Sequence, residues 1–322
     1  MINNADLVDA VRLNSLRTPH ATAWTQAARS PSMKDNETRF SLKWILGIPF
    51  AGKEYKYPNC GKAADALGVH QVACGRTGEI SKGHTRLRNT LFDLLSQVKY
   101  SLSLEKHLPN STLRPGDVFI ANYDPLPVAV DCTIVTPTRI VGISRAKPTS
   151  KAFYAELMDY AAANKLKMYS HLCAAAGWMF RPFVTDSYGG IRADARHMIG
   201  QLITRSKKFM TEEESTAYSS SAWINISAAA VSRAGIQLCA AHAVINSSLH
   251  TPAQGFISED ISTSSSACND MGNVTSFQPS QPVEVVGANN NDEDEDTPVL
   301  GRTHERATLE DDQLQDEAQM YD

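Results

Sequence analysis

Two short stretches decide the fold: residues 114–120, RPGDVFI, and residues 128–135, VAVDCTIV. Each is rich in β-branched or aromatic residues and about as long as a short strand, and the NYDP cluster at 122–125 is typical of a hairpin turn. The pair predicts neighbouring strands that bring Asp117 and Asp131 to one end of a sheet. Carboxylates held close together repel unless a cation lies between them, and Mg²⁺ binds one or two carboxylates together with water and phosphate oxygens. The pattern therefore indicates metal-assisted phosphodiester cleavage.

Hydrophobic spacing and turn residues predict the elements on either side. A helix over 82–98 has an apolar stripe at helical spacing, and a helix over 150–176 ends at Gly177. The last helix opens on Thr211, three residues before Glu214, as in a capping box. The other predicted elements are helices over 6–14, 39–46, 193–209 and 211–245 and strands over 100–104 and 178–185. The order helix, three strands, helix, strand, helices implies a mixed α/β core with helices packed on the sheet.

The composition is that of a globular protein with one or two domains, because the chain has 322 residues of which 42% are hydrophobic. No run of 18 apolar residues occurs, and the MINNAD start lacks a basic and then apolar leader, so we expect neither a secreted nor a membrane-spanning protein. Six cysteines are scattered without a compact framework. We expect reduced intracellular thiols, of which at most two bind a metal.

The formal net charge of −4 conceals an asymmetry along the chain. Residues 255–322 contain 16 of the 35 acidic residues and 2 of the 31 basic ones, which leaves 19 acidic and 29 basic residues in 1–254, a net charge of +10. A basic body suits a polyanion such as nucleic acid, although excess lysine and arginine also occurs on solvated surfaces. Residues 249–322 are predicted to form a disordered acidic tail, because Ser-, Asn- and Asp-rich runs bury too little apolar surface.

A lysine beside the two carboxylates would orient the attacking water in a sheet-based metal nuclease. Thr133 occupies the position two residues after Asp131, so the lysine has to come from the helix over 150–176. Lys165 lies at the edge of the apolar stripe of that helix, whereas Lys167 points nearer to solvent. We therefore predict Lys165 as the catalytic lysine and Tyr169, one turn later, as its support or as a substrate contact. The predicted stripe comprises Leu157, Ala161, Met168, Leu172 and Ala175.

Several motifs occur in a definite order between about residues 18 and 248. They are PHATAW at 19–24, WILGIP at 44–49, CG at 60–61 with His70 and Cys74, GHTRLRN at 83–89, LPN at 108–110, RPGDV at 114–118, VDCTIVTP at 130–137, AE at 155–156, Lys165, Tyr169, Cys173, GW at 177–178 and YGG at 188–190. Together they resemble the C-terminal region of LINE-type retrotransposon polyproteins, whose endonuclease has the restriction-endonuclease-like PD-(D/E)xK fold.

The resemblance implies roles for particular residues. Asp117 and Asp131 would hold Mg²⁺ or Mn²⁺, and Lys165 and Tyr169 would complete the catalytic set. The GHTRLRN segment is similar to a slipped version of the family's Arg-His-Asn segment. Its basic helix face is predicted to contact nucleic-acid phosphates, with a plain solvated face as the alternative. The residues on that face are His84, Arg86 and Arg88.

In the same family a zinc knuckle of Cys-x2-Cys, His and Cys precedes the nuclease. Cys60, His70 and Cys74 match the last three ligands, whereas Tyr57 stands at the first position. Because structural zinc takes four ligands, we expect a degraded or weak Zn²⁺ site, with water or His84 in the open position. The predicted domains are an N-terminal helical segment at 1–54, the zinc-knuckle-like segment at 55–80, the endonuclease-like α/β domain at 81–248 and the tail.

The sequence thus predicts a retrotransposon-derived endonuclease that binds DNA, or alternatively RNA, and uses neither a membrane nor a small-molecule cofactor. The resemblance implies a nuclear location. A reverse-transcriptase palm signature is missing, so we expect a piece detached from the polymerase. One alternative is a catalytically inactive nucleic-acid-binding remnant, in which Asp131 forms only a buried salt bridge. Another is a protein-interaction module that uses the last helix through Trp223, Ile224, Ile226, Val231 and Leu238.

Overall fold

The computed structural model describes residues 4–29, 33–52, 55–57, 60–74, 79–139 and 150–250. All of them belong to one compact unit, Met1–Phe256, which includes the predicted segments 1–54 and 81–248. The predicted acidic tail, except for residues 249 and 250 at the end of the last helix, lies outside the described residues, as does Cys268.

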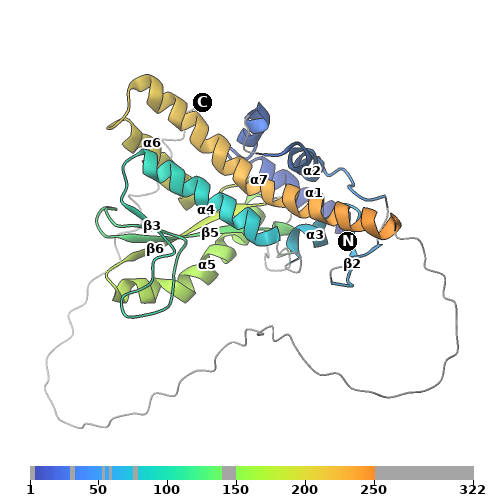
Figure 1. The fold of residues 1–322 in the computed structure, drawn as a ribbon, viewed down its shortest axis with the longest axis horizontal. Helices are drawn as coiled ribbons and strands as arrows, with labels where there is room; N and C mark the ends of the chain where they lie inside the picture. The colour runs from blue at the N-terminus through green and yellow to red at the C-terminus, as the bar shows by residue number, and fades with distance from the viewer. Residues whose placement is uncertain are drawn as a thin grey trace, which may run out of the picture. The chain divides into compact units, whose positions relative to one another are not determined.

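A four-stranded sheet with the order β3-β4-β5-β6 forms the centre of the fold (Figure 1). Its strands are β3 (Leu102–Leu104), β4 (Val118–Ile120), β5 (Val128–Val135) and β6 (Met179–Asp186). The first three strands run antiparallel, and β5 pairs parallel with β6 along its whole length. The long helix α5 (Lys151–Ala175) makes the crossover between β5 and β6. The fold is therefore mixed α/β, with a small mixed sheet flanked by helices, as the sequence predicted.

The hairpin of β4 and β5 sets Asp117 next to Asp131. Val118 faces Val130 in the antiparallel ladder, and the Asp117 N–H donates to the Val130 carbonyl at 2.9 Å. A side chain at position 116 would place its Cβ 2.9 Å from the same carbonyl oxygen. Gly116 therefore lets the RPGD turn lie against the β5 backbone. The strand is shorter than predicted, and Asp117 immediately precedes it.

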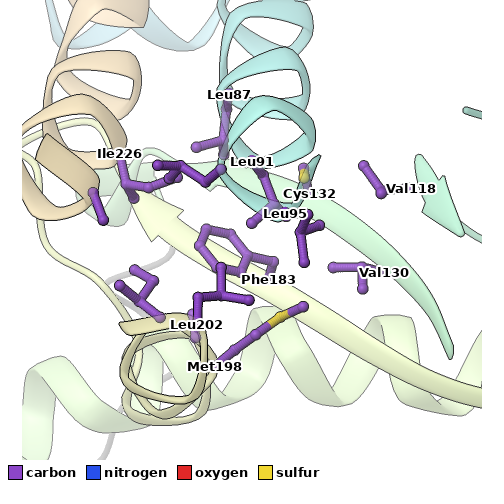
Figure 2. Close-up of a cluster of buried hydrophobic side chains, with 14 of the residues drawn as sticks. Leu87, Leu91, Leu95, Val118, Val130, Cys132, Phe183, Met198, Leu202 and Ile226 are labelled. Atoms are coloured by element: carbon purple, nitrogen blue, oxygen red, sulfur yellow. The ribbon is translucent and has the colours of Figure 1, made fainter. Parts of the chain in front are cut away.

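Side chains of β5 alternate between the two faces of the sheet, as the period of a strand requires. Val130 and Cys132 pack into a cluster with α4 (Glu79–Gln97), α6 (Ala193–Ser206) and α7 (Glu212–His250). Figure 2 shows Leu87, Leu91 and Leu95 of α4 above Phe183 of β6. Ala129 faces the opposite way and packs with Cys173 of α5. The sheet is thus a middle layer between α5 and the other three helices.

The N-terminal elements form a second core around the far half of α7. They are α1 (Asn4–Leu16), η1 (Ala23–Arg29), α2 (Asp35–Leu46), the hairpin of β1 (Tyr55–Lys56) and β2 (Ala63–Ala64), and α3 (Val69–Ala73); the short η3 (Pro137–Arg139) follows β5. Glycine at position 235 is needed because a Cβ there would overlap with the Glu37 carbonyl of α2. Helix α7 therefore joins both cores.

The apolar face of α7 is covered. Ile226, Val231 and Leu238 are fully buried, and Trp223 and Ile224 pack against the two cores as partly buried residues. In length and composition Glu212–Ser247 would allow a membrane span, but 61% of its most apolar window is buried inside the protein. This burial is typical of a core helix. The side chains described on α7, from 212 to 247, therefore do not form the exposed apolar face that a protein-interaction module would need.

Helix caps confirm two predicted helix starts, whereas part of the predicted stripe on α5 is wrong. The Ser150 hydroxyl accepts from the Phe153 N–H, and Thr211 and Glu214 form the reciprocal bonds of a capping box. Met168, however, is 55% exposed, and Ala175 is exposed as well. The buried residues of α5 are Phe153, Tyr154, Leu157, Met158, Ala162 and Cys173. Lys165 and Tyr169 continue this line, so Lys165 faces the sheet more directly than the sequence suggested.

Candidate active site and metal centre

Asp131 lies in the middle of β5 with its side chain toward α5, and only 8% of the residue is exposed. The Nζ of Lys165 lies 3.0 Å from Oδ1 and 3.0 Å from Oδ2 of this carboxylate. Thr133 donates its hydroxyl to Oδ2 at 2.9 Å. Burial raises the pKa of Asp131, and the Lys165 ammonium group opposes that shift. The predicted pairing of Lys165 with Asp131 is therefore present in the structure.

Asp117 is held from the other side of the hairpin. Its Oδ2 accepts the Cys132 N–H at 2.7 Å and lies 3.2 Å from Nε2 of His84 on α4. A side-chain hydrogen bond to Asp117 raises the pKa of His84, and the charges of Asp117 and Asp131 add to the shift, whereas burial opposes it. In the structure His84 has a carboxylate partner, and its predicted contact with phosphate stays a prediction. Its spacing of four residues from Arg88 is the signal that both lie on one side of α4.

The two carboxylates interact electrostatically, because the negative charge of Asp117 also raises the pKa of Asp131. The pair lies between two basic groups: Lys165 from α5 on one side of the sheet and His84 from α4 on the other. Clusters of groups that shift one another's pKa values are concentrated at functional sites. The arrangement is therefore a candidate functional site.

The two predicted phosphate-binding arginines are already paired. Arg86 donates to Glu37 of α2 at 2.8 Å, which directs it away from the carboxylate pair. Arg88 donates to Glu105 at 2.6 Å, and Arg114 donates to the other oxygen of Glu105 at the same distance. Glu105 is therefore the anchor of two arginines. Arg88 and Arg114 form a basic edge beside β3 and β4, whereas Arg86 does not belong to it.

Tyr169 contacts Lys165 through its ring. The Nζ of Lys165 lies 5.8 Å from the Tyr169 ring centroid, and the ring packs against Phe180 of β6 at 5.4 Å. A cation over an aromatic face is attracted by the ring quadrupole. Tyr169 thus combines core packing with the predicted support of Lys165, and its alternative role as a substrate contact stays a prediction.

A second cluster lies in the N-terminal core. The ligand atoms of Cys60, His70 and Cys74 lie within 4.8 Å of one another, with Cys60 Sγ 3.0 Å from His70 Nε2. Asp65 orients His70 by accepting the backbone N–H groups of Gly68, Val69 and His70, which open α3. Two thiols and an imidazole are typical zinc ligands, so the group could hold a metal such as zinc.

Tyr57 lies beside this cluster. It is fully buried, its hydroxyl has no hydrogen-bond partner among the described residues, and its ring centroid lies 5.7 Å from that of His70. Burial, with the nearby Cys74 thiol as the next cause, raises the pKa of Tyr57 to about 12. The alternative fourth ligand His84 is excluded from the cluster because it pairs with Asp117. The five cysteines of the described segments are all free.

A buried carboxylate that the sequence analysis did not single out ends β6. Asp186 is fully buried and accepts the hydroxyls of Tyr154 and Ser15 and the backbone N–H groups of Tyr188 and Gly190. It ties α1, α5 and the Gly-Gly turn together. The YGG motif was its only signal in the sequence.

Comparisons with models of protein families and with curated proteins find no match for this chain. The assignment of function therefore depends on the sequence motifs and on the geometry of the two clusters.

Proposed function

We propose that residues 81–248 form a restriction-endonuclease-like domain of retrotransposon origin, which binds DNA and cleaves a phosphodiester bond with Mg²⁺ or Mn²⁺. The observation that carries this proposal is the contact of Lys165 with Asp131, 3.0 Å apart and beside a second carboxylate. The predicted order of one helix, three strands, a helix and a strand, present as α4 to β6, supports it. A buried salt bridge is weak evidence of stabilisation, so its place next to Asp117 and His84 favours a chemical role.

The proposed ligands of the magnesium ion are the two carboxylates at the hairpin. Asp117 and Asp131 offer hard carboxylate oxygens, and Oδ1 of Asp117 has no hydrogen-bond partner among the described residues. When bound between these side chains, the ion would lower the pKa of a water molecule and neutralise charge on the phosphate.

The two basic groups would serve the reaction from opposite sides. Lys165, held by Asp131 and by the Tyr169 ring, would orient the attacking water and face the developing negative charge. His84 keeps its proton to higher pH than a free histidine, because Asp117 accepts its hydrogen bond.

A specific observation favours the second candidate function, an inactive remnant that binds nucleic acid. Both oxygens of Asp131 and Oδ2 of Asp117 already accept hydrogen bonds from the protein. A carboxylate oxygen has two lone pairs, so a metal can share these atoms, but it competes with Lys165 for them. If a metal ion cannot displace Lys165 from these oxygens, the protein would bind nucleic-acid phosphate but would not cleave it.

The test is nicking of supercoiled plasmid and of a branched or single-stranded oligonucleotide with Mg²⁺ or Mn²⁺ at two salt concentrations. We expect Asp131→Ala and Lys165→Ala to lose activity by roughly a hundredfold or more, as for the loss of one transition-state donor. Asp93→Ala on α4 and Lys167→Ala on α5 are matched controls, since both residues are exposed. Salt-sensitive binding by a wild-type protein that cleaves nothing would favour the inactive remnant. Absence of any binding would contradict both functions.

The zinc proposal has its own test, the metal content of the purified protein. We expect weak binding of at most one zinc ion per chain, lost in a Cys60→Ser and Cys74→Ser double variant and retained in Cys239→Ser, the control for a partly buried thiol. Tyr57→Cys would complete four ligands and should bind zinc more tightly. Equal zinc content in the wild type and the double variant would contradict the site.

A further inference from the structure

A cavity of about 370 Å³ lies between the end of α1, the first half of α5 and the junction of β6 with α6. Ile191, Arg192 and Ala193 of its wall follow β6 directly, so the cavity lies beyond the carboxyl ends of the parallel strands β5 and β6. Ligands of open α/β sheets bind preferentially at this end. Met158 of the wall precedes Lys165 by seven residues, or about 10 Å along α5, so the cavity is separate from the carboxylate pair.

The wall of this cavity carries more positive than negative charge. Three guanidinium groups line it, those of Arg17, Arg192 and Arg196, against the single carboxylate of Asp159. Arg192 is neutralised by ion pairs with Asp159, at 2.8 Å, and with Asp194. For Arg17 and Arg196, in contrast, the described part of the chain provides no ion-pair partner. Two positive charges therefore remain available to an anion.

Arg196 is the more informative of the two. One of its nitrogens donates to the Ile191 carbonyl at 2.7 Å, which fixes the side chain at the cavity wall. Burial lowers the pKa of Arg196, since the charged group is partly removed from water. The carboxylate of Asp194 opposes this shift, but no ion pair joins it to Arg196 in the described part of the chain, so an anion in the cavity would further offset the cost of burying the charge.

The shape and the remaining wall indicate what accompanies the anion. The volume lies in the range of small-molecule sites and is much larger than a bare phosphate needs. Pro19, Met158 and Ile191 give the cavity an apolar side, whereas Asn14 and Thr18 add hydrogen-bonding groups. A planar, partly polar group attached to a phosphate would match such a wall, and arginine binds phosphate through two parallel hydrogen bonds.

We infer that this cavity binds a nucleoside monophosphate unit through Arg17 and Arg196, either as a free nucleotide or as the 5′-phosphorylated end of a strand. The inference goes beyond the proposed nuclease function and does not depend on it, because none of the cavity residues belongs to the Asp117 and Asp131 site.

Calorimetric titration of the full chain tests the inference. The probes are adenosine monophosphate, adenosine, inorganic phosphate and a trinucleotide with a 5′-phosphate or a 5′-hydroxyl. We expect saturable binding of the monophosphate and weaker binding of adenosine and of phosphate. Arg196→Gln and Arg17→Gln should each weaken the monophosphate about tenfold, the effect of losing a charge-assisted hydrogen bond. Lys207→Gln, which removes an exposed charge at the opposite end of α6, should bind as the wild type does.

The comparison of probes identifies the source of the ligand: tighter binding of the 5′-phosphorylated trinucleotide indicates a strand end, and tighter binding of the monophosphate indicates a free nucleotide. Circular dichroism shows whether each variant is folded, and Arg17 is exposed, so its replacement keeps the test valid if Arg196→Gln unfolds. The inference is overturned if no phosphorylated probe saturates at millimolar concentration, if both arginine variants bind as the wild type, or if Lys207→Gln weakens binding equally. Phosphate binding as tight as that of the monophosphate would overturn the nucleoside part. Asp131→Ala should bind the monophosphate normally, so failure of the nuclease proposal is distinguishable.

Discussion

Asp131 and Asp186 are buried carboxylates on the neighbouring parallel strands β5 and β6, but their surroundings differ. Asp186 is fully enclosed and accepts two hydroxyls and two backbone N–H groups, with no ammonium or guanidinium group among those partners. Asp131 is 8% exposed, and a partly exposed lysine approaches both of its oxygens. The contrast indicates that Asp186, which is fixed by neutral donors, holds structural elements together. Asp131 is paired with the side chain of Lys165, which is partly exposed and can move, so Asp131 can exchange this partner for another.

The largest effect is expected from Asp186→Ala. This change leaves four buried donors without an acceptor, and we expect a loss of about 3 to 5 kcal/mol in the free energy of unfolding. Urea denaturation measures it, with Asp93→Ala as a control that should change stability by no more than about 0.5 kcal/mol. A loss below about 1 kcal/mol would contradict the role of Asp186 in connecting α1, α5 and the Gly-Gly turn.

The second-largest loss of stability is expected from a change in the turn at 188–190, whose backbone N–H groups donate to Asp186. A Cβ at position 190 would overlap with the Tyr154 hydroxyl and stand 2.6 Å from Asp186 Oδ2. We expect Gly190→Ala to cost about 1 to 3 kcal/mol through overpacking. Gly200 of α6 has open space around a built Cβ, so Gly200→Ala should stabilise the protein by about 0.5 to 1 kcal/mol. Thermal denaturation measures both variants. If Gly190→Ala and Gly200→Ala changed the melting temperature equally, the turn would not be tightly packed.

The pH dependence of stability should also reflect Asp186. Burial raises its pKa in the folded protein above the ordinary value of 3.8, although its hydrogen bonds oppose the shift. The stability contributed by this group is therefore fully present below pH 3.8 and is lost as the pH rises through the folded pKa. Each pH unit of difference between the folded and unfolded values corresponds to about 1.4 kcal/mol. Asp186→Asn should remove this decline from denaturation curves measured above pH 4, and a decline of the same size in the variant would assign it to other groups.

The smallest stability effect is expected at the proposed active site. Asp131→Asn removes an unfavourable buried charge and leaves Lys165 partly in water, so the two changes offset each other. We expect a change of no more than about 1 kcal/mol in the presence of a metal chelator. A loss as large as that of Asp186→Ala would make the ion pair a structural feature and would weaken the nuclease proposal.

Patterns local in sequence were sufficient for much of the fold. The stretch RPGDVFI before VAVDCTIV gave the hairpin, and the capping residues Ser150 and Thr211 marked helix starts correctly. Lys165 was found because helical spacing placed it beside an apolar stripe. The exposed Met168 was wrongly predicted to be buried. Periodicity gives the direction of a side chain around α5, but burial also requires that the sheet extends far enough to cover that side chain.

The partners of charged groups could not be predicted. His84 and Arg88 lie on one side of α4 by simple spacing, but Asp117 and Glu105 reach them only through the order of the sheet. The network of Asp186 joins Ser15 to a residue 171 positions later. The basic cavity likewise combines three arginines from the end of α1 and from the start of α6.

The sequence by itself determined the element order, the hairpin that sets Asp117 beside Asp131, and the Cys60, His70 and Cys74 set, since each depends on spacing, turn chemistry or residue type within a short segment. Only the tertiary structure decided that Lys165 faces Asp131, that Arg86 is turned toward Glu37, that Tyr57 is buried beside the cysteines, and that Arg17 and Arg196 share a cavity. The physical reason is that burial and charge pairing depend on which layers meet, and that depends on the whole chain packing at once.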